Sequence, residues 1–282
     1  MRKRRYFWSA PTGIDGLLLL AFLYWKVGQC RVISILRLFC ALVVGIFDKM
    51  ASISWVAIED RLQACVCIPN QFNGWCAVLT HPHPKLGGDL DNNVVVAVSR
   101  ALEQIGIATI RFNTRGVGQS LGSSTWRGVD EREDVKAAIN FAWTLPNVKK
   151  VALVAYSFGA AVGLSVSAEM AAAKKLNAVV VLGYPKGFIA SFVFSAHYSL
   201  IDPKSDIPKL FVLGDSDDFT SVSTMRTLFN KVSEPKELVI ISNMDHFCLG
   251  QEHFIAEPVV NFFQSKVLGK IWALQYKNSE AT

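Results

Sequence analysis

The sequence predicts an α/β domain with a mostly parallel, twisted sheet and helices on both faces. Short apolar segments, typical of buried strands, alternate with segments of helical periodicity from residue 53 to about residue 268. Polar or glycine-rich segments follow several of these strands. Because the carboxyl ends of parallel strands meet at one edge of a sheet, we expect the functional side chains in those connections.

The first half of the pattern contains four strands and one helix. Residues 53–58 and 62–68 have the composition of short strands, and residues 75–80 form a continuous apolar run bounded by turn residues. Apolar residues at helical spacing predict a helix over 92–105, which a glycine ends. Residues 107–112 form the next expected strand, and a glycine-rich loop follows it.

The second half repeats the alternation. An acidic first turn, which the helix dipole favours, begins a helix through residues 135–142. An expected strand at 151–155 leads into a helix of small residues that Ser157 opens. Three further strands and a last helix are expected at 178–182, 210–213, 238–241 and about 257–268.

The excess of positive charge comes entirely from the beginning of the chain. The formal net charge is +6, and residues 1–49 contain eight basic and two acidic residues, so residues 50–282 are neutral overall. A nucleic-acid site needs clustered positive charge to pair with phosphates. We therefore expect no nucleic-acid partner for the body of the protein.

Three interpretations of the first 49 residues stay open. Their two apolar runs are each shorter than a confident membrane-spanning helix. They form a membrane-associating or targeting extension, a buried helical pair, or a dispensable segment before a functional start at Met50. We expect an intracellular, cytoplasmic protein, with an organelle or membrane association through this extension as the alternative. The expected organisation is an extension at 1–49, one α/β domain at 50–270 and a tail at 271–282.

Cysteine usage gives no sign of a metal or redox centre. The six cysteines contain no C-x-x-C pair, so neither a zinc ribbon nor a thioredoxin-type motif is supported. We expect reduced, buried thiols and neither a metal nor a cofactor. The run Arg115-Gly116-Val117-Gly118 lacks the third glycine of a dinucleotide fingerprint, and a P-loop is absent from the sequence. This run is better explained as a tight loop that Arg111 or Arg115 ties to a neighbouring acid.

The segment Ala155-Tyr156-Ser157-Phe158-Gly159 approximates the G-x-S-x-G nucleophile elbow. Such a turn exposes its serine between a strand and a helix, and it needs small residues two positions before and after. Ala155 departs from the usual glycine by one methyl group. The alternative interpretation is an ordinary serine N-cap.

An acid and a histidine follow later strands in the order that a serine nucleophile needs. Asp217 lies in Gly214-Asp215-Ser216-Asp217-Asp218, and His246 comes after the last expected strand. The order serine, acid, histidine is that of the α/β hydrolases. A lone histidine is more often structural, but three residues at strand ends in this order favour a catalytic set.

With these motifs the chain resembles the α/β-hydrolase superfamily over about residues 55–265. It is most similar to compact esterase-like and dienelactone-hydrolase-like proteins of bacteria and plants. The segments that carry the resemblance are His81-Pro82-His83-Pro84 with Gly87-Gly88, the run from Arg111 to Ser120, the elbow, Gly214-x-x-Asp217 and Asp245-His246-Phe247.

The resemblance implies a role for each of these residues. Ser157 is implied as nucleophile, His246 as general base and then acid, and Asp217 as the orienting carboxylate. Asp215 and Asp218 remain alternatives for the acid, and Asp245 is expected to be structural. The oxyanion donors would be the N–H of Phe158 and one N–H from the loop after His81. Because proline has no N–H, that second donor is His83 or Lys85.

The implied function is a serine hydrolase that cleaves an acyl ester or thioester through an acyl-enzyme. The substrate would be a small acyl-containing molecule. A catalytically inactive binding protein on the same fold is the alternative. Between Gly183 and Pro208 the fold has room only for a short cap insertion. Its aromatic residues form either a wall over Ser157 or part of the core, and they are Phe188, Phe192, Phe194, His197 and Tyr198.

Overall fold

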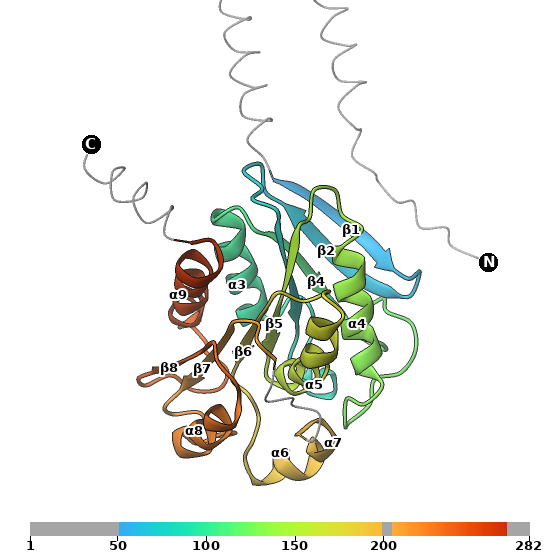
Figure 1. Cartoon of the computed structure of the whole chain (residues 1–282). Helices are drawn as coiled ribbons and strands as arrows, with labels where there is room; N and C mark the ends of the chain where they lie inside the picture. Colours follow the sequence, from blue (N-terminus) through green and yellow to red (C-terminus); the bar gives the residue numbers. More distant parts are fainter. Residues whose placement is uncertain (1–50, 199–204, 270–282) are drawn as a thin grey trace, which may run out of the picture. The chain divides into compact units, whose positions relative to one another are not determined.

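The computed structural model describes residues 51–198 and 205–269, and Figure 1 shows their arrangement. Eight strands form one open, twisted sheet in the order β1-β2-β4-β3-β5-β6-β7-β8. The strands are β1 (Ser52–Ile58), β2 (Leu62–Ile68), β3 (Trp75–Thr80), β4 (Ala108–Phe112), β5 (Lys150–Tyr156), β6 (Ala178–Leu182), β7 (Lys209–Gly214) and β8 (Lys236–Ile241).

The sheet is parallel except at one end. Strand β2 pairs antiparallel with both β1 and β4, whereas every other neighbouring pair is parallel. The parallel strands therefore all end at the same edge, and the loops that leave them meet there. The expected mostly parallel sheet is confirmed.

Helices cover both faces of the sheet (Figure 1). The sheet divides the hydrophobic core into two layers. Alternate residues of β3 show the division, since Val78 packs in one layer while Ala77 and Leu79 pack in the other. One layer lies under α4 (Glu131–Ala142), α5 (Phe158–Ala172) and α8 (Val222–Lys231). The other lies under α3 (Asn93–Gln104) and α9 (Glu252–Phe262), which the π-helical turn η2 (Phe263–Val267) extends.

Two helices differ from the sequence expectation. Helix α8 was not expected, although Ser221 caps it and Met225 and Leu228 bury its apolar face. Helix α9 begins at Glu252 rather than near residue 257 and runs through Pro258. Proline is unfavourable inside a helix, but the buried face of α9 contacts α3 along its length and outweighs the local preference. The sequence also did not predict the short helical segments at 84–86, 188–193 and 195–198. The other strands and helices agree with expectation to within a few residues at their ends.

The predicted extension at 1–49 and the tail at 271–282 lie outside the described residues, so both stay predictions. The described residues, all from Ala51 onward, belong to one compact unit. No helix in the described part of the chain is long and apolar enough to cross a membrane. Four of the cysteines are described, and all four are buried free thiols, as expected: Cys65, Cys67, Cys76 and Cys248.

Candidate active site

Ser157 lies on a sharp turn between β5 and α5. Its backbone has φ 55° and ψ −120°, a conformation that residues other than glycine rarely adopt. Its N–H donates to the carbonyl of Leu182, at the end of the neighbouring strand, over 2.9 Å. Strain of this kind persists only where the surroundings impose it, and it is found at functional sites. The turn places Ser157 at the carboxyl edge of the sheet.

Small residues let the elbow pack closely. A Cβ added at Gly159 would lie 2.3 Å from Thr80 Oγ1 and 2.7 Å from the His81 carbonyl, so only glycine fits there. A Cβ at Gly163 would lie 3.1 Å from the Ala155 methyl. The extra methyl group that Ala155 brings is therefore accommodated by a glycine two turns further along the chain.

Ser157, His246 and Asp217 form one chain of hydrogen bonds. Ser157 Oγ is 2.8 Å from His246 Nε2, and His246 Nδ1 is 2.7 Å from Asp217 Oδ2. The second carboxylate oxygen, Oδ1, accepts the backbone N–H groups of Phe219 (2.8 Å) and Thr220 (2.9 Å). All three side chains are largely buried. With the Nδ1 proton directed at Asp217, Nε2 presents its lone pair to the serine hydroxyl.

The structure also places the other acids that were considered. Asp215 Oδ1 accepts the N–H of Asn243, and Asp218 is exposed. Asp245 Oδ1 accepts the N–H groups of Phe247 and Cys248 in its own loop, which agrees with the expected structural role. Among these acids, Asp217 is the one that contacts the imidazole.

Three residues that the sequence analysis did not single out fix the position of His246. The ring of Phe219 lies 4.2 Å from the imidazole, and Tyr156 O–H donates to the His246 carbonyl over 2.7 Å. Gly183 has φ 53°, and a Cβ there would lie 3.3 Å from His246 Cε1. A glycine directly after β6 was the available sequence signal. Tyr156 and Phe219 gave none, because an aromatic residue beside a strand end is usually core.

His83 and Phe158 meet beside the nucleophile, with ring centroids 4.6 Å apart. Lys85 donates its backbone N–H to His83 Nδ1 over 3.1 Å, so His83 Nε2–H donates to the Trp126 carbonyl, also over 3.1 Å. Burial lowers the pKa of His83. Gly128 lets the loop that carries Trp126 approach, since a Cβ there would lie 2.7 Å from the Phe158 ring. The Lys85 amide is thus already engaged.

His81 ties the end of β3 to the end of β4. Its Nε2 accepts the backbone N–H of Thr114 over 3.1 Å, so its proton is on Nδ1, which donates to the Pro82 carbonyl over 2.7 Å. Complete burial lowers its pKa to about 4. His81 is therefore a neutral structural histidine that fixes the loop leading to His83.

The described part of the cap insertion contains two short helices, α6 (Phe188–Val193) and α7 (Ser195–Tyr198). Phe194 is buried 5.8 Å from the ring of Phe158, whereas Phe192 is exposed. Tyr198 packs on the buried Tyr184, with ring centroids 6.0 Å apart. The side chain of Phe188 lies outside the described set. The aromatic residues of the cap therefore divide between core and surface.

A buried polar contact fastens this cap to the body. His197 Nδ1 accepts Arg132 Nε–H over 3.2 Å, and His197 Nε2–H donates to the Arg127 carbonyl over 2.6 Å. Arg132 also donates to the Ala196 carbonyl over 2.7 Å. Burial lowers the pKa of His197 to about 4, so this histidine is neutral as well.

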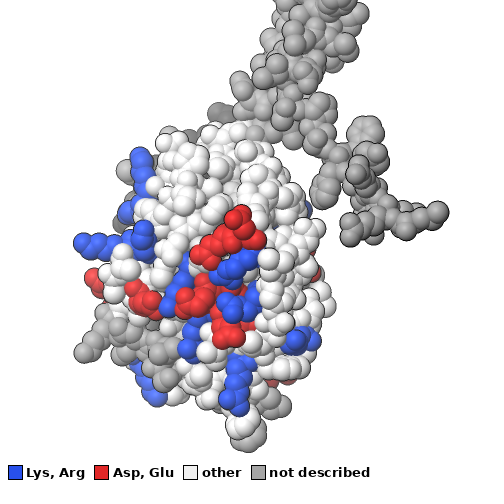
Figure 2. Space-filling model, turned by 90° about the vertical axis from the view of Figure 1, so that its right-hand side faces the viewer, with Lys and Arg blue, Asp and Glu red and all other residues white. Residues whose placement is uncertain are grey.

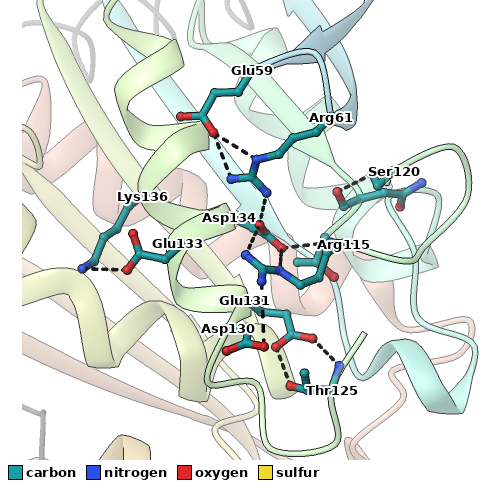
Figure 3. A network of polar contacts seen from close by, with 12 residues as sticks. Glu59, Arg61, Arg115, Ser120, Thr125, Asp130, Glu131, Glu133, Asp134 and Lys136 are labelled. Atoms are coloured by element: carbon teal, nitrogen blue, oxygen red, sulfur yellow. Dashed lines mark hydrogen bonds and ion pairs between the residues drawn. The ribbon is translucent and has the colours of Figure 1, made fainter. Parts of the chain in front are cut away.

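A separate polar network surrounds Asp134 on α4 (Figure 3). Asp134 accepts hydrogen bonds from the guanidinium groups of Arg61 and Arg115 and from the Arg115 N–H. Burial alone would raise the pKa of Asp134, but these bonds hold it below its usual value. Glu131 accepts both the N–H and the hydroxyl of Thr125 at 2.6 Å. Arg115 thus ties the loop after β4 to a neighbouring acid, as one of the two arginines was expected to do.

The face over α4 and α5 also carries a charged groove of about 530 Å³ that does not include Ser157. Basic and acidic side chains alternate on this face rather than forming a patch of one sign (Figure 2). Lys136, for example, pairs with Glu133 and Glu169 at 3.2 and 2.7 Å. The charged residues that line this groove are balanced, with three basic and three acidic side chains.

Known proteins resemble this chain in sequence and in fold. An uncharacterized protein of Rickettsia prowazekii is 28% identical over 195 residues, which are 67% of this chain and 78% of the relative. An α/β serine hydrolase homologue from Coxiella burnetii is 28% identical, with a TM-score of 0.64 over 74% of this chain and 96% of its own.

A second solved structure supports the fold alone. An α/β serine hydrolase without lid from Xanthomonas campestris is 23% identical, with a TM-score of 0.62 over 76% of this chain and 94% of its own. The family model described as PhoPQ-activated pathogenicity-related protein matches residues 95–276, more than half of the chain. The chain therefore belongs to the family of PhoPQ-activated pathogenicity-related proteins, and its fold is that of the α/β-hydrolase superfamily.

Proposed function

We propose that this protein is a serine hydrolase that cleaves acyl esters or thioesters through an acyl-enzyme. The observation that carries the proposal is the hydrogen-bonded chain from Ser157 Oγ to His246 Nε2 and from His246 Nδ1 to Asp217 Oδ2. The serine of this hydrogen-bonded chain has a strained backbone conformation and directly precedes a helix. A structural serine N-cap would bond to its own helix, and the Ser157 side chain makes no such cap bond.

In the proposed reaction Ser157 Oγ attacks the acyl carbon while its proton passes to His246 Nε2. The bond to the leaving group then breaks, and His246 returns the proton to the departing oxygen or sulfur. Water next attacks the acyl carbon of the acyl-enzyme and gives one proton to His246. The bond between that carbon and Ser157 Oγ then breaks, the carboxylic acid leaves, and His246 returns the proton to Ser157 Oγ. Asp217 stabilises the imidazolium that forms in both halves.

The oxyanion donors proposed are the backbone N–H groups of Phe158 and His83. Phe158 is the first residue of α5, so its N–H has no acceptor within the helix. Between His83 and Lys85, the structure favours His83 because the Lys85 N–H is already donated to the His83 ring. The positive end of the α5 dipole adds to this stabilisation.

Carboxylic esters are the first substrate class to test, followed by thioesters and amides. The solved structures with this fold include serine hydrolases and esterases. The strongest alternative, an inactive binding protein on the same fold, predicts an intact hydrogen-bonded chain without turnover.

A fluorophosphonate probe separates the two functions, since it reacts only with an activated serine. We expect wild-type protein to be labelled at Ser157, as located by peptide mass, and Ser157→Ala to remain unlabelled. Ser167→Ala is the matched control, because this serine lies on the same helix and its hydroxyl donates only to the Leu164 carbonyl. Absence of labelling in wild-type protein would favour the inactive alternative.

A further inference from the structure

Most of the exposed large apolar side chains lie in segments that follow the carboxyl ends of strands, as Ser157 does. Eleven such side chains are exposed in the described residues, and eight of them lie in segments that leave the carboxyl ends of strands. Where exposed apolar side chains adjoin one another, they indicate a binding surface, and Phe219 and Phe247 are in contact beside the candidate site. The eight are Leu86, Leu121, Trp126, Val129, Phe192, Phe219, Phe247 and Leu249.

Two members of this group contact the imidazole of His246. Phe219 lies against one face, with ring centroids 4.2 Å apart, and it remains 37% exposed. Phe247 meets the imidazole edge-to-face at 5.7 Å and is 56% exposed. The two phenyl rings also meet each other edge-to-face at 6.1 Å. Together they form an apolar surface next to the proposed proton donor.

The backbone that presents Phe247 is held on both sides. Its N–H donates to Asp245 Oδ1 over 3.0 Å, and its carbonyl accepts Asn93 Nδ2–H over 3.2 Å, across from α3. An exposed ring on a fixed backbone costs little further entropy when a ligand covers it. Such preorganisation is what a binding surface requires.

The proposed chemistry determines which half of a substrate meets this surface. When the acyl–oxygen bond breaks, His246 Nε2 must lie within hydrogen-bond reach of the leaving oxygen. The carbonyl oxygen meanwhile lies at the start of α5, beside Phe158. The substituent on the leaving oxygen therefore extends from His246, where Phe219 and Phe247 lie.

We propose that this site selects esters whose leaving alcohol carries a large apolar group, which lies on Phe219 and Phe247. The inference rests on the proposed function and names its substrate class. In acylation the Ser157 Oγ–carbon bond forms and the bond between carbon and the leaving oxygen breaks. The serine proton reaches the alcohol through His246, and the apolar alcohol departs over the two rings.

Two matched series of soluble esters test the assignment in the full chain. Methyl, butyl and hexyl acetate vary the alcohol but form the same acetyl-enzyme, so differences in kcat/KM report acylation alone. We expect kcat/KM to rise about tenfold from methyl to hexyl acetate, as partial burial of the added methylenes implies. Methyl acetate, methyl butyrate and methyl hexanoate vary the acyl group instead.

Substitution of the rings locates the effect. Phe247→Ser should reduce the rise across the acetate series to less than about threefold while the acyl series keeps its slope. Phe219→Leu should reduce the rise of kcat/KM across the acetate series by a smaller factor, because leucine retains apolar surface. Trp55→Ser, which removes an exposed aromatic residue from edge strand β1, should leave both series as in wild-type protein.

The outcomes separate this inference from the proposed function. A protein whose Ser157 is labelled by fluorophosphonate but whose acetate series is flat or undetectable would overturn the alcohol assignment alone. The same holds if Phe247→Ser flattens the acyl series and leaves the acetate series steep. Loss of labelling at Ser157 would overturn the proposed function itself.

Discussion

Asp134 and Asp217 are both buried, yet their surroundings differ in kind. Asp134 is bonded by two guanidinium groups, those of Arg61 and Arg115, and by a backbone N–H. Asp217 is bonded by two backbone N–H groups and by the imidazole of His246. One carboxylate thus faces two permanent positive charges, and the other faces only dipoles and a group that can gain a charge.

In the proposed mechanism this difference separates a structural carboxylate, Asp134, from a catalytic one, Asp217. The negative charge of Asp134 is already compensated, so it holds together the loops around α4 and has no charge left to stabilise a reaction. The charge of Asp217 is desolvated but not neutralised by a fixed cation. In the proposed mechanism it is therefore available to stabilise His246 when the imidazole takes the proton from Ser157.

The sharpest test of the contrast removes the charge of Asp217 and keeps its size. We expect Asp217→Asn to lower kcat/KM by about 10⁴-fold, because the imidazolium loses its partner and the wrong tautomer of His246 is favoured. Steady-state hydrolysis of a good ester substrate measures the loss, and circular dichroism checks that the fold is kept. A decrease of less than about tenfold in a folded variant would assign the orienting acid to another residue.

The same substitution at Asp134 should have the opposite consequence. Asp134→Asn leaves two arginines without their shared carboxylate, and we expect the free energy of unfolding to fall by about 3 kcal/mol at pH 7. Because the bonds in the folded state hold the pKa of Asp134 below its usual value, this stability is present above the unfolded pKa. This contribution to stability is lost as the pH falls through the pKa of Asp134 in the folded state.

Urea unfolding at pH 7 and pH 3 measures this effect. The gap between wild-type protein and Asp134→Asn should be smaller at pH 3 than at pH 7, because pH 3 lies below the unfolded-state pKa of the carboxyl group. Activity per folded molecule should stay within about threefold of wild type at pH 7. A catalytic loss as large as that of Asp217→Asn would remove the distinction between the two carboxylates.

Much of the fold and the proximity of the site residues could be predicted from sequence, because both depend on regular patterns. Buried strands are continuous apolar runs, and parallel strands bring the residues after their ends to one edge. This is why Ser157, Asp217 and His246 lie together although 89 residues separate the first from the last. Their roles in catalysis stay a proposal.

The features that escaped sequence analysis depend on contacts between distant segments. Helix α8 carries a short apolar stripe that is weaker than the strand signals on either side of it. Gly183, Tyr156 and Phe219 acquire their importance only because the fold brings them against His246. A side chain that packs on a functional group has the same local sequence pattern as one that packs in the core.

The contrast extends to the histidines. His81 is buried and neutral, whereas the proposed mechanism requires His246 to exchange a proton. Burial lowers the pKa of His81 to about 4. Between pH 4 and its unfolded pKa near 6.5, the folded state therefore binds fewer protons than the unfolded chain, and stability rises with pH. We expect this histidine to contribute about 1–2 kcal/mol to the difference between pH 5 and pH 6.5.

His81→Gln tests that contribution, because glutamine offers an acceptor to Thr114 but does not titrate. Denaturant unfolding at pH 5 and pH 6.5 should show a smaller pH dependence in the variant than in wild-type protein. The variant His253→Gln, at an exposed histidine on α9, is the control and should keep the wild-type dependence. Equal dependence in all three proteins would mean that His81 is protonated in the folded state.

The smallest effect is expected at Tyr156, which holds the backbone of His246 by a hydrogen bond. Tyr156→Phe removes the hydroxyl that donates to the His246 carbonyl over 2.7 Å and keeps the ring that stacks on the imidazole. The lost bond should lower the free energy of unfolding by about 1 kcal/mol. Because the released carbonyl belongs to His246 itself, we also expect kcat to fall by about threefold with KM unchanged. Stopped-flow measurement of acylation locates the effect, and an unchanged acylation rate would show that ring stacking alone positions the imidazole.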